Sequence, residues 1–190
     1  MRYVLLVLAA GLIAGPALAD DSVTNGAKAL GDSVEGAGHL TVSAAQVGLT
    51  ASVLPAAVGA SFAHREIDKS RICINIQNDG DSMYAPGALW TASHHKVPML
   101  TIMWNNRAYH QEIMHLQRMA NWRQRDVSTA YIGTTIRNPF VQYEKLAESM
   151  GVTGIGPITD PKDLGAAIKR GVEAVKAGEP VLINVVTQPR

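Results

Sequence analysis

The chain has 190 residues, a hydrophobic content of 47% and a formal net charge of +1 at pH 7. This length fits one domain, with or without a short appendage, and the hydrophobic content is sufficient for a core. The near-zero net charge indicates neither nucleic-acid binding nor binding to an anionic membrane surface. The single cysteine, Cys73, excludes an intrachain disulfide.

Residues 1–19 form a distinct first segment. Arg2 is its only early charge, and an almost wholly apolar run follows it. The run is short for a membrane span and ends in Ala17-Leu18-Ala19, the pattern of small residues that precedes a signal-peptide cleavage site. We therefore expect a secretory signal peptide over 1–19, export of the chain, and a mature form that begins at Asp20 and has no membrane segment. A buried N-terminal helix is the alternative.

Residues 20–53 differ from the rest in composition. They are rich in alanine, glycine and serine and have few charges or aromatic residues. Such low complexity is typical of a linker or a short exported module, and no catalytic residue can be placed there. From Leu54 the composition changes again, and small residues are frequent over 54–66. We expect the folded domain to cover 54–190.

Two apolar, β-branched runs, 72–77 and 97–104, flank a segment with the pattern of a helix, 84–95. This arrangement predicts a strand–helix–strand unit with parallel strands. Because parallel strands end at one edge of a sheet, Asp79 and Asn106 are expected side by side just beyond the two strand ends. Open α/β sheets bind ligands at that edge.

The residue types at this edge indicate a cation site. Asp79 offers a carboxylate, Asn106 an amide oxygen, and the backbone at Ala108 a peptide carbonyl. Oxygen ligands of this kind suit Mg²⁺ or Ca²⁺. Gly80 would let the chain turn sharply and let a phosphate approach the backbone. The alternative is an ordinary Asp-Gly turn and an ordinary Asn-rich strand end, and either half of the pattern alone would be weak.

An Asp-Gly pair followed after roughly two dozen residues by an Asn-Asn pair resembles the signature of thiamine diphosphate enzymes, whose spacing is fixed by a strand–helix–strand unit. The chain from Leu54 onward is similar to their C-terminal diphosphate-binding (PP) domain, in the branch of acetolactate synthase and benzoylformate decarboxylase. Asn78 stands where this family usually has glycine. The resemblance implies Mg²⁺ ligands at Asp79, Asn106 and Ala108, and thiamine diphosphate contacts at Gly80, Asp81, Asn106, Ala108 and Tyr109. It implies no particular catalytic residue.

Three arginines, at 118, 123 and 125, surround Trp122. A basic cluster with an aromatic residue is one pattern of nucleic-acid binding. The low net charge instead favours a solvated, mobile segment over the edge of the active site.

The last part of the chain predicts two further helix–strand pairs. A helix over 143–150 ends at Gly151, and a strand follows over 152–156. Pro161 at the first turn opens a helix that runs to about residue 177, and a final strand covers 180–187. The whole pattern predicts a doubly wound α/β domain with a mostly parallel sheet. No site residue is assigned to these last four elements.

The resemblance implies a domain that binds thiamine diphosphate and Mg²⁺ and acts on a small 2-oxo acid as part of a decarboxylase or carboligase. In that family a separate pyrimidine-binding domain supplies a glutamate that promotes activation of the cofactor. The residues before 54 are too few to encode it at ordinary domain sizes, so we expect that domain to come from another chain, or the chain to self-associate. The alternative is an exported fusion or fragment with no turnover. The signal peptide predicts export, whereas the family alone would predict a cytoplasmic protein.

Overall fold

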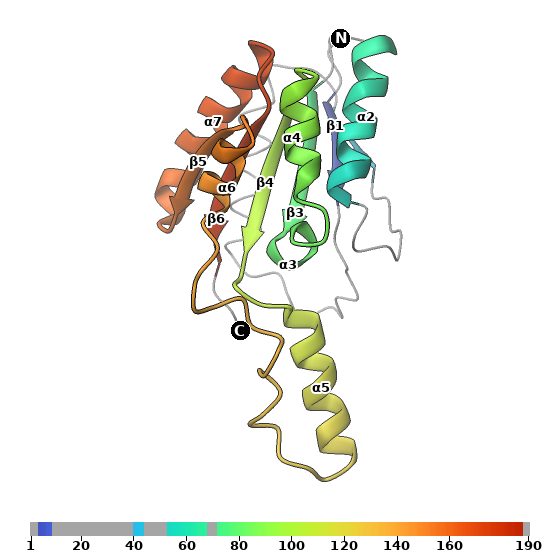
Figure 1. Cartoon of the computed structure of the whole chain (residues 1–190), viewed down its shortest axis with the longest axis vertical. Helices are drawn as coiled ribbons and strands as arrows, with labels where there is room; N and C mark the ends of the chain where they lie inside the picture. The colour runs from blue at the N-terminus through green and yellow to red at the C-terminus, as the bar shows by residue number, and fades with distance from the viewer. Residues whose placement is uncertain (1–3, 9–39, 44–52, 68–71, 188–190) are drawn as a thin grey trace.

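A computed structural model of the chain describes residues 4–8, 40–43, 53–67 and 72–187. Within these ranges the backbone forms a six-stranded sheet in the order β2-β1-β3-β4-β6-β5, and every pair of neighbouring strands is parallel (Figure 1). The strands are β1 Val4–Leu8, β2 Leu40–Ser43, β3 Ile72–Asn78, β4 Met99–Asn105, β5 Thr153–Ile158 and β6 Val181–Val186.

Helices cover both faces of the sheet. The described helices are α2 Val53–Ile67, α3 Asp79–Ser82, α4 Gly87–His94, α5 His110–Trp122, α6 Tyr143–Ser149 and α7 Pro161–Lys176. Side chains of α2, α4 and α6 share one apolar cluster with Met99, Met103 and Leu182 of the sheet. Side chains of α7 share a second cluster, on the other face, with Ile74 and Leu100. The predicted doubly wound α/β architecture with a parallel sheet is therefore confirmed.

Burial on both faces explains why β4 and β6 are apolar over most of their length and do not alternate regularly between apolar and polar residues. In β4 all residues except Trp104 are buried, and in β6 all except Val186. The pairs of helix and strand predicted for the C-terminal part are all present, with bounds that differ by a few residues. Asp160 caps α7 by accepting a hydrogen bond from the backbone nitrogen of Lys162 at 2.9 Å, and Pro161 is the first helical residue.

The N-terminal expectations fall mostly outside the described residues. Most of the expected signal peptide over 1–19, including the cleavage site, lies there, as does most of the low-complexity segment 20–53. Two short pieces are described: Val4–Leu8 forms β1, between β2 and β3, and Leu40–Ser43 forms β2. A chain cleaved after Ala19 would lack β1, so processing and its consequences for this edge of the sheet remain predictions.

The structure differs from the sequence predictions at two helices. The predicted helix 84–95 is preceded by a separate short helix, α3, and itself begins only at Gly87, directly after Pro86. Proline favours the start of a helix and restricts the residue before it, which explains the interruption. No helix was predicted around Arg118 and Trp122, which were expected in a solvated, mobile segment, but both lie in α5, a helix of 13 residues.

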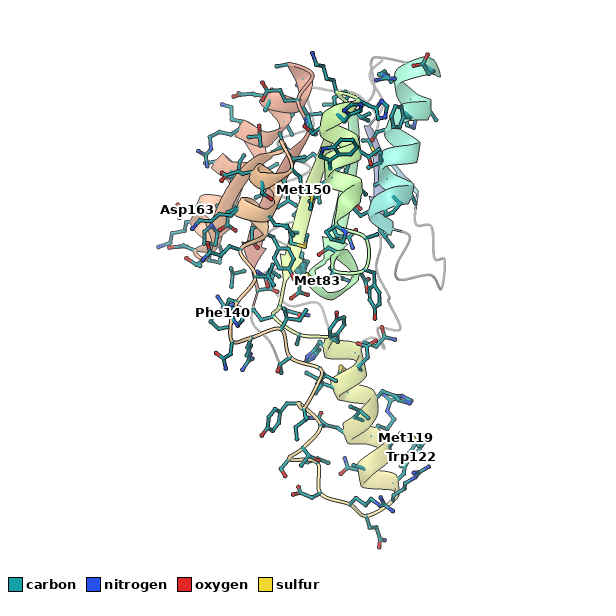
Figure 2. All side chains as sticks on the ribbon, in the orientation of Figure 1. Met83, Met119, Trp122, Phe140, Met150 and Asp163 are labelled. Atoms are coloured by element: carbon teal, nitrogen blue, oxygen red, sulfur yellow. The ribbon has the colours of Figure 1, made fainter. Side chains whose placement is uncertain are left out.

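Helix α5 and the loop after it extend away from the sheet, beyond the carboxyl ends of β3 and β4 (Figure 1). No residue of α5 is buried. Figure 2 shows Met119 and Trp122 near the outer end of this helix, and Phe140 closer to the sheet. Several large apolar side chains of the helix and loop are exposed, among them Met114, Leu116, Trp122, Tyr131 and Ile132. None of the described helices has the length and apolarity needed to cross a membrane.

Two leucines test this division between a packed sheet and a projecting helix. Leu100 is fully buried in β4, whereas Leu116 of α5 is 44% exposed. We expect Leu100→Ala to lower the free energy of unfolding by about 2–5 kcal/mol, because it leaves a cavity in the core. Leu116→Ala, the matched control, should change it by about 0.5 kcal/mol or less. Urea unfolding of both variants measures the difference, and similar costs would contradict the arrangement.

Candidate functional site

The site lies where β3 and β4 end. The parallel register pairs Asn78 with Trp104, so Asp79 and Asn105 leave the sheet at the same edge. The backbone nitrogen of Arg107 donates a hydrogen bond of 2.6 Å to Oδ2 of Asp79. The turn that carries Asn106 is thus joined to Asp79 across the strand ends, as the sequence predicts.

Asp79 is a buried carboxylate, only 1% exposed. Its Oδ1 accepts a hydrogen bond of 3.0 Å from the backbone nitrogen of Gly80. Burial raises the pKa of Asp79 to about 6, and the hydrogen bonds from the peptide groups of Gly80, Arg107 and Ala108 lower it only in part. Burial opposes the charged form, while N–H donors stabilise it.

No lysine, arginine or histidine in the described part of the chain forms an ion pair with this carboxylate; the ion pair found there joins Arg65 to Glu66. A buried carboxylate that lacks a cationic partner is costly unless a cation binds to it. The described residues also contain no cluster of three or more histidine, cysteine or acidic side chains suited to a metal. A site of one carboxylate, one amide and one peptide carbonyl would not count as such a cluster. Its three donors are all oxygen atoms, and oxygen donors suit a hard cation such as Mg²⁺.

Two hydroxyl groups hold the backbone of Asp79 in place. Its carbonyl oxygen accepts hydrogen bonds from Oγ of Ser82 at 2.7 Å and from the hydroxyl of Tyr143 at 3.1 Å. Tyr143 is the first residue of α6 and only 1% exposed. The sequence did not reveal this contact, because it joins residues 64 positions apart. In the sequence Tyr143 is only the first residue of a predicted amphipathic helix.

The turn after β4 is ordered by its own side chains and by the loop after α5. Oδ1 of Asn106 accepts a hydrogen bond of 3.0 Å from the backbone nitrogen of Ala108, and an amide oxygen keeps a second lone pair for another partner. Ala108 pairs in an antiparallel bridge with Thr135. The hydrogen bonds on either side of this bridge are Tyr109 N to Thr134 O and Ile136 N to Arg107 O.

Arg107 adopts a left-handed backbone conformation with φ of 61°. A non-glycine residue in this region is uncommon and is held there by its surroundings. The backbone groups of Arg107 contact Asp79 and Ile136, and its guanidinium lies 4.2 Å from the centre of the Phe140 ring. Sequence reasoning gave Arg107 no role. An arginine between an Asn-Asn pair and a buried alanine carries no signal that would reveal this conformation.

Gly80 has a different structural role from the predicted one. It lies in α3 and is not among the residues with positive φ, so no sharp left-handed turn requires it. A Cβ at this position would lie 2.6 Å and 2.7 Å from two ring carbons of Tyr109. Gly80 is therefore needed for the close approach of the Tyr109 ring. Asn78 is extended, with φ of −76°, so glycine is not required there either.

Asp81 lies beside the site and is half-buried. Its Oδ2 accepts a hydrogen bond of 3.4 Å from Nδ2 of Asn78. Burial raises the pKa of Asp81, the hydrogen bond from Asn78 lowers it, and the charge of Glu112 raises it. The structure thus gathers the predicted residues at one edge of the sheet, while their roles toward a cofactor or metal stay predictions.

Comparison with known proteins agrees with this geometry. A family model described as "Thiamine pyrophosphate enzyme, C-terminal TPP binding domain" matches residues 31–185, more than half of the chain. The chain belongs to this family. The match begins before residue 54, where we expected the domain to start, and it includes β2. The resemblance predicted from the Asp-Gly and Asn-Asn pairs is therefore confirmed.

One curated relative and two solved structures are similar to parts of this chain. A protein of Mycobacterium tuberculosis named as a putative acetolactate synthase large subunit, IlvX, is 31% identical over 99 residues, which are 52% of this chain and 18% of that protein. The thiamine diphosphate-dependent 4-hydroxybenzoylformate decarboxylase of Rhodococcus jostii RHA1 matches 80% of this chain and 25% of its own, with 28% identity and a TM-score of 0.59. The benzoylformate decarboxylase of Polynucleobacter necessarius shows the same fold over 78% of this chain, with 19% identity and a TM-score of 0.58.

The chain therefore corresponds to a small part of these proteins: the matches cover 18% of the M. tuberculosis protein and 25% of each of the two decarboxylases. It is a domain of the thiamine diphosphate-binding type, similar to domains found in acetolactate synthase and decarboxylases. The activities of those whole proteins do not transfer to it directly.

The contact between Gly80 and Tyr109 leads to a testable prediction. Gly80→Ala should lower the free energy of unfolding by about 1–3 kcal/mol, because the new methyl group overlaps the ring. Gly87→Ala is the matched control, since nothing lies within 4 Å of a Cβ there. If the ring is the cause, the cost of Gly80→Ala should shrink in a Tyr109→Ala background. Thermal unfolding of the single and double variants measures this, and an unchanged cost in the double variant would refute the assignment.

The raised pKa of Asp79 predicts how the stability of the metal-free chain depends on pH. A pKa that is higher in the folded than in the unfolded state contributes stability that is fully present below the unfolded value of 3.8 and is lost as the pH rises through about 6. Relative to Asp79→Asn, the wild-type chain should lose up to about 3 kcal/mol of unfolding free energy between pH 4 and pH 7. Urea unfolding with a chelator present measures the difference at each pH, and a flat difference would contradict the raised pKa.

Proposed function

We propose that the chain binds thiamine diphosphate through Mg²⁺ at the carboxyl edge of β3 and β4. The observation that carries this proposal is the buried carboxylate of Asp79, which lacks a cationic partner in the described residues and is tied to the Asn106 turn. Asp79 would supply the anionic ligand, Asn106 its amide oxygen and Ala108 its peptide carbonyl. Membership of the thiamine diphosphate-binding family supports the choice of cofactor.

The chain's own residues would orient the cofactor and hold its charge. Gly80 and Asp81 would lie along the diphosphate, and the ring of Tyr109, packed on Gly80, would form a wall of the site. The hydroxyl groups of Ser82 and Tyr143 would keep the Asp79 backbone fixed as the metal binds. When bound, thiamine diphosphate supplies the electron sink for decarboxylation of a 2-oxo acid.

The reaction that we propose is part of 2-oxo acid decarboxylation or carboligation, as in an acetolactate synthase or benzoylformate decarboxylase. Supporting it are the 31% identity to the M. tuberculosis protein and the 28% identity to the R. jostii decarboxylase. The partner that we propose is a pyrimidine-binding domain of another chain, or a second copy of this chain; the relatives are much longer than the part that the chain matches. The exposed apolar side chains of α5 and its loop offer surface for such contacts. A fragment that binds cofactor without turnover is the second candidate, and export remains a proposal from the sequence alone.

Three substitutions test the metal site and its register. Asp79→Ala should abolish Mg²⁺-dependent binding of thiamine diphosphate, because it removes the one carboxylate among the three proposed protein ligands. Asn106→Ala should weaken it less, since water can replace one neutral oxygen. Asp81→Ala should leave the Mg²⁺ dependence intact, because this side chain accepts a hydrogen bond from Asn78 and is not one of the proposed metal ligands.

Calorimetric titration of thiamine diphosphate at a series of Mg²⁺ concentrations measures all three effects. The Asp81 variant is the control for loss of a nearby negative charge. If Asp81→Ala removes the Mg²⁺ dependence and Asp79→Ala keeps it, the assignment of the ligand is wrong. A wild-type chain that binds but does not turn over a 2-oxo acid, with or without a pyrimidine-binding domain added, would favour the second candidate.

A further inference from the structure

A chain of buried polar side chains leads from α6 to the candidate site. Oε2 of Glu144 accepts a hydrogen bond of 2.6 Å from Nδ2 of Asn184 in β6. Oδ1 of Asn184 accepts one of 3.1 Å from Nδ2 of Asn105, at the end of β4. Oδ1 of Asn105 accepts one of 3.2 Å from the backbone nitrogen of Arg107. That same nitrogen donates to Asp79.

All three side chains of this relay are buried: Glu144 is 6% exposed, Asn105 4% and Asn184 2%. Buried polar groups are retained at a cost unless they are fully hydrogen-bonded, so a continuous relay in the interior needs an explanation. Helix α6 lies over the sheet at β5 and β6 (Figure 1). Gly154 of β5 permits this approach, because a Cβ there would overlap the backbone carbonyl of Glu144.

The chemistry of Glu144 sets the direction of the relay. An ionised carboxylate only accepts hydrogen bonds, whereas a carboxamide can donate from one side and accept on the other. Glu144 therefore selects the orientation of Asn184 in which the NH₂ group points to the carboxylate and the oxygen to Asn105. Asn105 must then donate to Asn184 and turn its own oxygen toward Arg107. A hydrogen bond to an ionised carboxylate is stronger than one between neutral groups.

We propose that Glu144 is a positioning residue for the cofactor site and that it acts through Asn184 and Asn105. By fixing both amides, it presents an acceptor to the backbone nitrogen of Arg107. That peptide is in the left-handed conformation and lies between Asn106 and Ala108, the two expected metal ligands of the turn. The turn is therefore held from two sides, by Asp79 and by the Glu144 relay. The metal-related part of this inference depends on the proposed function.

Reversal of the relay is the expected result of Glu144→Gln. A glutamine can donate as well as accept, so Asn184 can turn over, and Asn105 then presents its NH₂ group to the N–H of Arg107. Two donors facing each other repel, and the Arg107 peptide loses one acceptor. The double variant Glu144→Gln/Asn184→Asp should restore the direction, because a carboxylate introduced at position 184 can only accept and receives hydrogen bonds from both neighbours. Asn184→Asp alone places two carboxylates together and should destabilise the fold.

The experiment compares the full-length wild-type chain with these variants and with Glu148→Gln, a control at an exposed glutamate one turn further along the same helix. The first readout is hydrogen exchange of the Arg107 backbone amide by NMR, without cofactor. The second is the Mg²⁺ dissociation constant in the presence of thiamine diphosphate. We expect Glu144→Gln to speed exchange at Arg107 and to weaken Mg²⁺ binding by about tenfold, as found for other residues that orient metal ligands. The double variant should bind Mg²⁺ within about threefold of the wild-type dissociation constant, and Glu148→Gln should match the wild type in both readouts.

Three results would overturn the inference. The first is Arg107 exchange in Glu144→Gln at the wild-type rate, and the second is a double variant no better than Glu144→Gln alone. The third is faster exchange spread evenly over the sheet, since it would mean a loss of general stability. If the wild-type chain fails to bind Mg²⁺ and thiamine diphosphate, the proposed function is wrong. Exchange at Arg107 would still decide whether Glu144 orients the turn.

Discussion

The hydrogen bond between the Arg107 peptide nitrogen and the buried carboxylate of Asp79 is the contact on which the site depends. It joins the segments that follow two neighbouring parallel strands. Its acceptor, the Asp79 carboxylate, is buried, and no side-chain cation among the described residues forms an ion pair with it. The fold makes this contact possible, because parallel strands deliver both segments to one edge of the sheet. The cost of that buried charge is the physical reason to expect a cation there.

Other elements of the domain act on this contact from a distance. The hydroxyl of Tyr143 holds the Asp79 carbonyl, and the neighbouring residue, Glu144, begins the relay that reaches Arg107. Consecutive residues of α6 therefore fix both partners of one hydrogen bond. A packed sheet transmits such restraints well, because its side chains have few alternative positions. Helix α5, by contrast, contributes no buried residue and presents apolar surface outside this rigid part.

Much of this arrangement can be predicted from the sequence, because it follows from local patterns. The apolar runs at 72–77 and 97–104 indicate parallel strands, and their register alone brings Asp79 and Asn106 to one edge. The parts that could not be predicted depend on contacts between distant segments. Tyr143, Asn184 and the left-handed Arg107 acquire their roles only once α6, β6 and the loop after α5 are in place. Helix α5 was missed because the arginines around Trp122 favoured a solvated, mobile segment, and because no residue of this helix packs into the core.

The location of a bound metal tests the central claim most directly. Mn²⁺, added with thiamine diphosphate to the isotope-labelled chain, broadens the NMR signals of backbone amides near the ion. Our account predicts that the signals of 79–81 and 105–109 disappear first, while those of α7 and the outer end of α5 remain. Broadening centred on any other part of the chain, or none at concentrations of Mn²⁺ and cofactor that saturate related enzymes, would contradict a cofactor site at the ends of β3 and β4.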